Sequence, residues 1–394
     1  MRTPGSTRTI ITLALATLAL GCDSTGGPGT EPTPEDIAKG QQIFRMDTFG
    51  DEQFWTDTLH LERVVQQAVD PTTALAVGLK VDMDALPADL VQAIQAGKVD
   101  LKSPATTLAL LKLDAVVGVK GTVQSVGGRD TLTRLGITCA LCHSTVDDAF
   151  AKGIGHRKDG WPNHDLNVGA IVALSPVLPA SAKAVFNSWG PGMYDPRFNI
   201  DGQNTPLVIP PAYGLAQVRN ETYTAEGPVS YWNAYVAVTQ MHAHGTFSDP
   251  RLGINIVQTP DLVTSKLPAL RAYQFSLQVP PAPAGSFDAA AAARGQVVFN
   301  ASCASCHVGA TLTDNNSGVL HAPSETGVDA RYALRTPTKR YRTTPLRGLW
   351  QHAPYFHDGS AKTLADVVEH YDTVRGLHLS AAQKQDLVAY LKTL

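Results

Sequence analysis

Two stretches, Cys139-Ala140-Leu141-Cys142-His143 and Cys303-Ala304-Ser305-Cys306-His307, decide how this chain of 394 residues folds. Both follow the pattern Cys-X-X-Cys-His, and together they contain four of its five cysteines. This spacing brings two thiols onto one helical turn, where they can add to the two vinyl groups of a haem while the adjacent imidazole binds the iron. The pattern therefore predicts two covalently bound haem c groups, with His143 and His307 as proximal iron ligands.

Three other uses of paired cysteines compete with this interpretation. A structural disulfide would suit an oxidising compartment, but it does not explain why a histidine follows both pairs. Two Cys-X-X-Cys knuckles can also hold zinc, although these two pairs stand far apart in the chain. A thioredoxin-like redox pair usually opens a helix in a strand-rich unit, and neither context is rich in strand signals. The repeated histidine favours haem.

The segments around the two motifs are also similar. Ala38-Lys39-Gly40-Gln41-Gln42-Ile43-Phe44 near the start parallels Ala293-Arg294-Gly295-Gln296-Val297-Val298-Phe299 before the second motif. Leu270-Arg271-Ala272-Tyr273 likewise parallels Leu387-Val388-Ala389-Tyr390, in apolar patterns of helical spacing. We expect each unit to be held together by a first and a last helix that cross at a glycine and an aromatic residue.

This repeat predicts an all-α fold with two cytochrome c-like modules in tandem. The first module covers residues 36–279 and the second covers 285–394, with a Pro-rich linker at 280–284. An insertion at about 46–135 separates the opening helix of the first module from its haem motif.

The insertion carries no recognisable chemistry of its own. Apolar spacing predicts helices at 52–68 and 88–96. The alternating stretch 116–123, interrupted by Gly118 and Gly121, predicts a short β-hairpin. We expect the insertion to cover the first haem or to dock a partner.

The start of the chain is typical of an exported protein. Arg2 and Arg8 flank an apolar stretch, 10–20, that is too short to span a bilayer as a mature helix. The stretch ends at Ala19-Leu20-Gly21-Cys22, which resembles the bacterial lipobox, except that Ala19 replaces the usual Leu. We expect a signal peptide at 1–22, a lipid anchor on Cys22 that attaches the protein to a membrane, and a flexible tether at 23–35. An ordinary cleaved signal is the alternative, and either places the protein in the periplasm or cell envelope.

The composition limits the classes of function. With 43% hydrophobic and 17% charged residues the chain can form a sizeable core. A formal net charge of -3, without a long Lys/Arg run, argues against nucleic-acid binding. The 33 Gly and 26 Pro residues indicate many loops.

The second module contains a longer and more specific pattern. It runs through Thr343-Thr344-Pro345-Leu346-Arg347-Gly348-Leu349-Trp350, Ala353-Pro354-Tyr355-Phe356-His357-Asp358-Gly359, Thr363-Leu364 and Val368-Glu369-His370-Tyr371. These elements, in this order, resemble the bacterial dihaem cytochrome c peroxidase and MauG family. The resemblance implies an oxidoreductase that acts through its first haem on peroxide or another small oxidant or substrate. A small cytochrome, a cupredoxin or a quinol-linked donor would be its redox partner.

The resemblance also suggests the distal ligand of the second haem. Its module contains no Met from residue 285 onward, so it cannot supply a thioether. In peroxidases of the family a Met binds at a position that Tyr371 occupies here, and MauG uses a tyrosine. A nearby histidine, or a packed tyrosine beside an open iron, remains the alternative.

The first module carries a fainter copy of the pattern. The peroxidases have a Glu-Met pair where this chain has Gln240-Met241, and their Glu handles peroxide protons on the distal side. Because an amide cannot be a general acid or base, Gln240 disfavours peroxide chemistry, and Glu226 is a candidate substitute. Met241 and His156 are candidate distal ligands, with core packing and an exposed loop as the respective alternatives.

Two further points follow from the resemblance. The family often holds calcium between its domains, for which Asn167, Thr343 and Pro345 are candidate ligands. The competing function is a pure electron-transfer cytochrome in which both haems are six-coordinate, since two strong axial ligands make an electron carrier.

Overall fold

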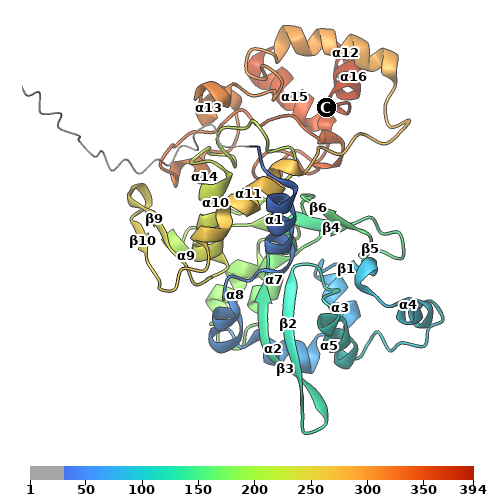
Figure 1. Cartoon of the computed structure of the whole chain (residues 1–394). Helices are drawn as coiled ribbons and strands as arrows, with labels where there is room; N and C mark the ends of the chain where they lie inside the picture. The colour runs from blue at the N-terminus through green and yellow to red at the C-terminus, as the bar shows by residue number, and fades with distance from the viewer. Residues whose placement is uncertain (1–30) are drawn as a thin grey trace, which may run out of the picture.

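A crossing of two helices organises the N-terminal part of the protein. α1 (Pro34–Met46) and α11 (Leu267–Ser276) lie side by side in the computed structural model (Figure 1). Gly40 allows their close approach, because a Cβ there would lie 2.0 Å from the backbone oxygen of Ala269. The ring of Phe44 packs edge-on against Tyr273, with 5.5 Å between the ring centroids. Both aromatic side chains are buried in one hydrophobic cluster.

The C-terminal part is built around a second crossing of the same kind. α12 (Ala289–Ser302) packs against α16 (Ala381–Leu391), with α15 (Leu364–Arg375) beside them at the top of Figure 1. A Cβ at Gly295 would lie 1.9 Å from the backbone oxygen of Asp386. The rings of Phe299 and Tyr390 are 5.1 Å apart. The packing is thus repeated at the two parallel sequence segments.

The structure describes residues 31–394, so the predicted signal peptide, Cys22 and most of the tether lie outside the described residues. Beyond the helices already named, the described chain contains α2 (Leu61–Ala68), α3 (Pro71–Ala76), α4 (Ala88–Gln95), α5 (Pro104–Lys112), α6 (Ala140–His143), α7 (Val168–Ala173), α8 (Ala180–Asn187), α9 (Phe198–Asp201), α10 (Val229–Tyr235), α13 (Pro323–Thr326) and α14 (Arg331–Leu334). It also contains two π-helices, η1 (Gln53–Thr58) and η3 (Val236–Gln240), and short 3-10 turns. No helix within 31–394 is both long and apolar enough to cross a membrane.

The all-α prediction is incomplete, because the described residues also form five two-stranded sheets. Their strands are β1 (Val81–Asp82), β2 (Val119–Val126), β3 (Arg129–Ile137), β4 (Ser144–Val146), β5 (Ile154–Gly155), β6 (Arg157–Asp159), β7 (Met193–Tyr194), β8 (Leu207–Val208), β9 (Phe247–Asp249) and β10 (Ile254–Ile256). The pairs β2–β3, β4–β6, β7–β8 and β9–β10 are antiparallel, whereas β1 pairs with β5 in parallel. Helix packing still dominates the core.

The insertion folds around its own hydrophobic cluster, between α2, α5 and the β2–β3 hairpin. The helix predicted at 52–68 is interrupted at His60, where a φ of 54° separates η1 from α2. The helix predicted at 88–96 corresponds to α4. The hairpin turns at Gly127-Gly128, with φ values of 58° and 79°, and therefore lies later in the chain than the stretch 116–123.

Candidate functional site

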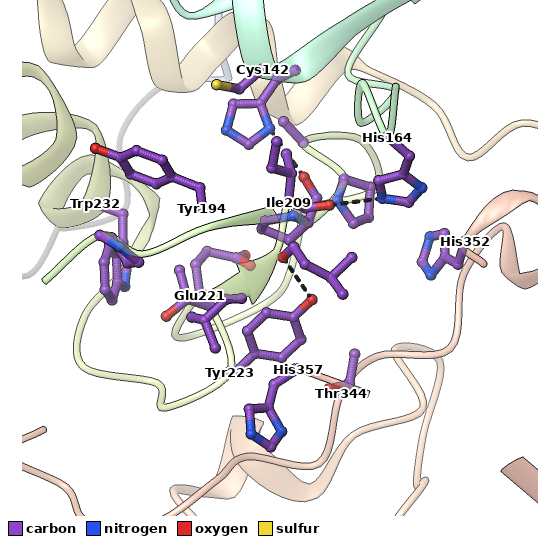
Figure 2. Close-up of a pocket in the computed structure, with 18 of the residues that line it drawn as sticks. Cys142, His164, Tyr194, Ile209, Glu221, Tyr223, Trp232, Thr344, His352 and His357 are labelled. Atoms are coloured by element: carbon purple, nitrogen blue, oxygen red, sulfur yellow. Dashed lines mark hydrogen bonds between the residues drawn. The ribbon is translucent and has the colours of Figure 1, made fainter. Parts of the chain in front are cut away.

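The two Cys-X-X-Cys-His motifs line one continuous cavity of about 670 Å³. Most of its lining side chains are apolar, and they come from both halves of the chain. From the motifs themselves the lining includes Cys139, Cys142, His143, Cys303, Cys306 and His307. In Figure 2, Cys142 lies at one end of the view and His357 at the other, with Glu221 and Tyr223 between them. The structure therefore brings together two motifs that are far apart in the sequence.

The histidines of the two motifs are held in the same way. His143 Nδ1 lies 3.0 Å from the carbonyl oxygen of Pro210, and His307 Nδ1 lies 3.0 Å from that of Leu312. Because a carbonyl oxygen can only accept, Nδ1 carries the proton in each ring and Nε2 keeps a free lone pair. Burial lowers the pKa of His143 to about 4 and also lowers that of His307, which keeps both rings neutral.

These features meet the requirements of covalent haem. A backbone hydrogen bond to Nδ1 is the usual way of orienting an imidazole that binds metal through Nε2. The four cysteines of the motifs are not joined in disulfides, and each pair stands beside its histidine at the cavity wall. The motif side chains thus fit haem c on donor chemistry as well as on spacing.

Different elements position the two motifs. The second motif directly follows α12, whose last turn continues through a hydrogen bond of 2.8 Å from Cys303 N to Phe299 O. The first motif follows β3 instead, and the insertion packs tightly against it. A Cβ at Gly118 would lie 2.1 Å from Leu141 N, and Thr138 N donates to Gly118 O at 2.9 Å.

Tyr371 lies in α15 and lines the cavity near the second motif. Burial raises its pKa to about 12, with a further contribution from the nearby thiols of Cys303 and Cys306. Its ring packs 5.9 Å from that of Phe356. Within residues 31–394, no hydrogen bond engages its hydroxyl group. Tyr371 therefore lines the same cavity as the second motif, with its hydroxyl group available, and its ligand role stays a prediction.

The neighbouring histidines are engaged elsewhere. His370 Nε2 lies 2.7 Å from Thr326 O, and the ring does not line the cavity. His352 and His357 do line it, but their Nε2 atoms lie 2.9 Å and 3.0 Å from the hydroxyl oxygens of Tyr213 and Tyr341. These contacts favour Tyr371 over a nearby histidine.

The two candidate distal ligands of the first module lie in different environments. Met241 is buried, lines the cavity and follows η3, and its carbonyl oxygen accepts a hydrogen bond of 3.1 Å from Trp55 Nε1. His156 is about half exposed, with Nδ1 2.9 Å from Asp84 Oδ1, and it does not line the cavity. In this structure Asp84 holds the His156 ring at the surface, outside the cavity, so its ligand role stays a prediction.

Gln240 and Glu226, the candidate catalytic residues, are both fixed by polar partners. Gln240 lines the cavity; its Oε1 accepts from Tyr194 Oη at 2.7 Å and its Nε2 donates to Thr239 Oγ1 at 2.8 Å. Glu226 does not line the cavity and forms a fully buried ion pair with Arg197. In this structure the Glu226 carboxylate neutralises a buried guanidinium and does not face the cavity, so its catalytic role stays a prediction.

The candidate calcium ligands do not share an environment. The side-chain oxygen of Asn167 accepts a hydrogen bond of 3.0 Å from Ala170 N and thereby caps α7. Thr343 and Pro345 line the cavity, whereas Asn167 does not. The carbonyl oxygen of Thr343 accepts from Thr313 Oγ1 at 2.6 Å. The side-chain oxygen of Asn167 is thus already used to cap α7.

Sequence reasoning missed the part of the insertion that reaches the first motif. Phe54 and Trp55 of η1 line the cavity together with Met241 and His242, which follow η3. Phe54 stacks on His242, with 3.7 Å between the ring centroids. π-Turns often occur at functional sites, but nothing in the helical spacing of 52–68 indicates one. Of the two roles expected for the insertion, the cavity lining supports a cover over the first motif.

Comparison with known proteins supports this chemistry. A family model described as RoxA-like, cytochrome c-like matches residues 340–374. The methylamine utilization protein MauG of Methylophilus methylotrophus is 29% identical over 124 residues, covering 26% of this chain and 36% of the relative. That of Methylorubrum extorquens is 31% identical over 129 residues, covering 26% and 34%. The chain thus spans about a third of the length of these curated relatives.

Two solved structures are partly similar. The Kuenenia stuttgartiensis hydrazine synthase has a TM-score of 0.36 and 21% identity, covering 48% of this chain and 73% of the other. A MauG-like protein associated with microbial copper homeostasis has a TM-score of 0.35 and 20% identity, covering 49% and 74%. These scores are too low to compare the folds. The chain is thus similar, over part of its length, to proteins named MauG and to a cytochrome c-like family model, which agrees with the haem-attachment chemistry of its motifs.

Proposed function

We propose that the chain is an exported dihaem c-type cytochrome that transfers electrons, with its first haem, at His143, acting on peroxide or another small oxidant or substrate. One observation carries the proposal: both Cys-X-X-Cys-His motifs line a single cavity, and in both the histidine directs its proton to a backbone carbonyl. The sequence similarity to proteins named MauG supports the same class of chemistry.

The residues of each motif have separate tasks. A bound haem c supplies one-electron chemistry, and its axial ligands decide whether its iron only carries electrons or also meets a substrate. The cysteines would hold a haem covalently, while the hydrogen bonds to Pro210 and Leu312 orient the two histidines. The mainly apolar lining would suit the apolar face of a haem.

The second module would exchange electrons with a redox partner, with Tyr371 as its distal ligand. We propose a small cytochrome, a cupredoxin or a quinol-linked donor as that partner. Export through the leader and anchorage at Cys22 would place the protein in the periplasm or cell envelope. The first module would then be the site of the reaction.

A pure electron-transfer cytochrome is the second candidate, and Gln240 favours it. Its amide cannot transfer a proton, and both ends of the amide are already hydrogen-bonded to neighbours. The replacement candidate, Glu226, is committed to Arg197. Peroxide chemistry would therefore need another proton donor on the distal side.

Electron paramagnetic resonance of the purified holoprotein at controlled potentials separates the two functions. A catalytic first haem should give a high-spin signal in the oxidised or half-reduced protein, and peroxide should change its absorption spectrum rapidly. Two low-spin signals in every redox state, without a response to peroxide or oxygen, would refute the enzymatic function and leave the electron carrier. The haem content, measured as the pyridine haemochrome, should be two per chain.

A further inference from the structure

A small charged cluster lies within the otherwise mainly apolar cavity. It consists of Glu221 from the first module and of Arg342 and Arg347 from the second. All three side chains line the cavity that contains both Cys-X-X-Cys-His motifs, and Glu221 lies near the centre of the view in Figure 2.

Glu221 and Arg342 form an ion pair that leaves polar atoms without partners. Arg342 Nη1 lies 3.2 Å from Glu221 Oε2, and the two side chains are only 9% and 8% exposed. Within the described residues, Glu221 Oε1 and Arg342 Nε make no hydrogen bond. Buried polar atoms without a partner are rare, and each one points to a group that has yet to be accounted for.

Arg347 adds a second guanidinium to the lining of the same cavity. Its side chain passes Gly214, where a Cβ would lie 3.3 Å from Arg347 Nη1. Among residues 31–394 no hydrogen bond or ion pair engages this guanidinium. Burial lowers the pKa of Arg347, the charge of Glu221 opposes that shift, and the charge of Arg342 adds to it. The three charges therefore act on one another.

The charges of the cluster do not balance. The cluster contains two guanidinium groups but one carboxylate, and that carboxylate is paired with Arg342. A positive charge in an apolar environment is costly unless an anion accompanies it. A planar guanidinium with several donors matches a carboxylate better than any other common anion except phosphate. The cluster is thus short of one carboxylate.

We propose that Arg342 and Arg347 bind a carboxylate, and that this carboxylate is a propionate of a bound haem. The proposal rests on the proposed function, since it requires haem at the motifs. The same chemistry could come from a small free carboxylate, but the cluster lines the same cavity as both motifs, so the cofactor is the nearer source. The negative charge of Glu221 offsets part of the positive charge of the two guanidinium groups. Glu221 therefore affects the electrostatic potential at the haem.

The test compares holoproteins in a redox titration followed by absorption spectroscopy. Arg347→Gln should lower the midpoint potential of at least one haem, because a positive charge that disfavours the oxidised iron is removed. Glu221→Gln should raise it for the opposite reason. Arg340→Gln is the matched control, since this arginine is about half exposed and close in the chain, and it should leave both potentials unchanged. Each titration is repeated with added acetate, which should have no effect.

The outcomes distinguish this proposal from the proposed function. Unchanged potentials in both variants, with two haems attached, would overturn the carboxylate site alone. A parent potential that responds to acetate, with the response lost in Arg347→Gln, would overturn the propionate assignment in favour of a free carboxylate. If Arg347→Gln loses its haems, Glu221→Gln and the charge-conserving Arg347→Lys provide the same comparison. A parent without covalent haem would refute the proposed function itself.

Discussion

Replacement of Gly295 by Ala tests whether α12 and α16 cross as closely as the structure has them. The added Cβ would lie 1.9 Å from Asp386 O and 2.4 Å from its carbonyl carbon, so backbone rather than a movable side chain is in the way. The helices would have to separate by about 1.5 Å to restore an ordinary contact of 3.4 Å.

The expected cost can be estimated from these contacts. Forced overpacking typically costs about 1–3 kcal/mol, and a clash between two backbones belongs at the upper end. The higher helix propensity of Ala returns about 1 kcal/mol. We therefore expect Gly295→Ala to lose about 2 kcal/mol of unfolding free energy.

Denaturant unfolding of the holoprotein, followed by helix circular dichroism, measures this loss. Gln296→Ala is the matched control, because Gln296 is the next residue of α12 and is exposed. It should change stability by no more than about 0.5 kcal/mol. Since α12 leads into Cys303, the Gly295→Ala variant should also alter the absorption band of one haem. Equal stability of the two variants would refute the close crossing.

Three further outcomes are expected. Tyr371→Phe should change the low-spin resonance of one haem only, and an unchanged spectrum would exclude Tyr371 as its ligand. Glu226→Gln should cost about 3–5 kcal/mol of stability, measured by denaturant unfolding, because it leaves Arg197 buried without a counter-charge; a stable variant that lost peroxide turnover would instead restore a catalytic role. Burial raises the pKa of Asp51 to about 9, so the folded state holds a proton that the unfolded state releases near pH 4. Its contribution to stability should therefore decrease from about pH 4 to pH 9, and thermal unfolding of Asp51→Asn should be less pH-dependent than that of the parent over this range.

Local and repeated signals made much of the architecture predictable from sequence. Gly40 and Gly295, each followed by a Phe at the same spacing, indicated helices that cross closely, and the Cβ distances explain why glycine is needed there. Each Cys-X-X-Cys-His motif could be recognised from the sequence because all of its functional side chains lie within five consecutive residues. Tyr371 was singled out by a resemblance spread over most of the second module, and the structure has it in the cavity lining.

The remaining features depend on contacts that no local pattern encodes. Glu226 looked free because its partner, Arg197, precedes it by many residues, and only folding buries the two together. His156 resembled a ligand loop, but the insertion supplies Asp84 to hold it at the surface. The predicted 52–68 helix is broken at His60, where η1 ends and α2 begins. The packing of η1 over the first motif is a tertiary contact, and helical periodicity does not predict it.

The different attachment of the two motifs has a consequence for how such a protein can diversify. The second motif directly follows α12 in the chain, so α12 sets its orientation. A change in α12 would therefore also disturb the packing of α12 against α16. The first motif is instead separated from α1 by the insertion and tied back to it through the 3.2 Å hydrogen bond from Thr138 Oγ1 to Arg45 O. Substitutions within the insertion can therefore retune the surroundings of His143 while the second centre keeps its geometry. The second motif is thus held in place by the helix that precedes it, whereas the surroundings of the first motif can change with the insertion.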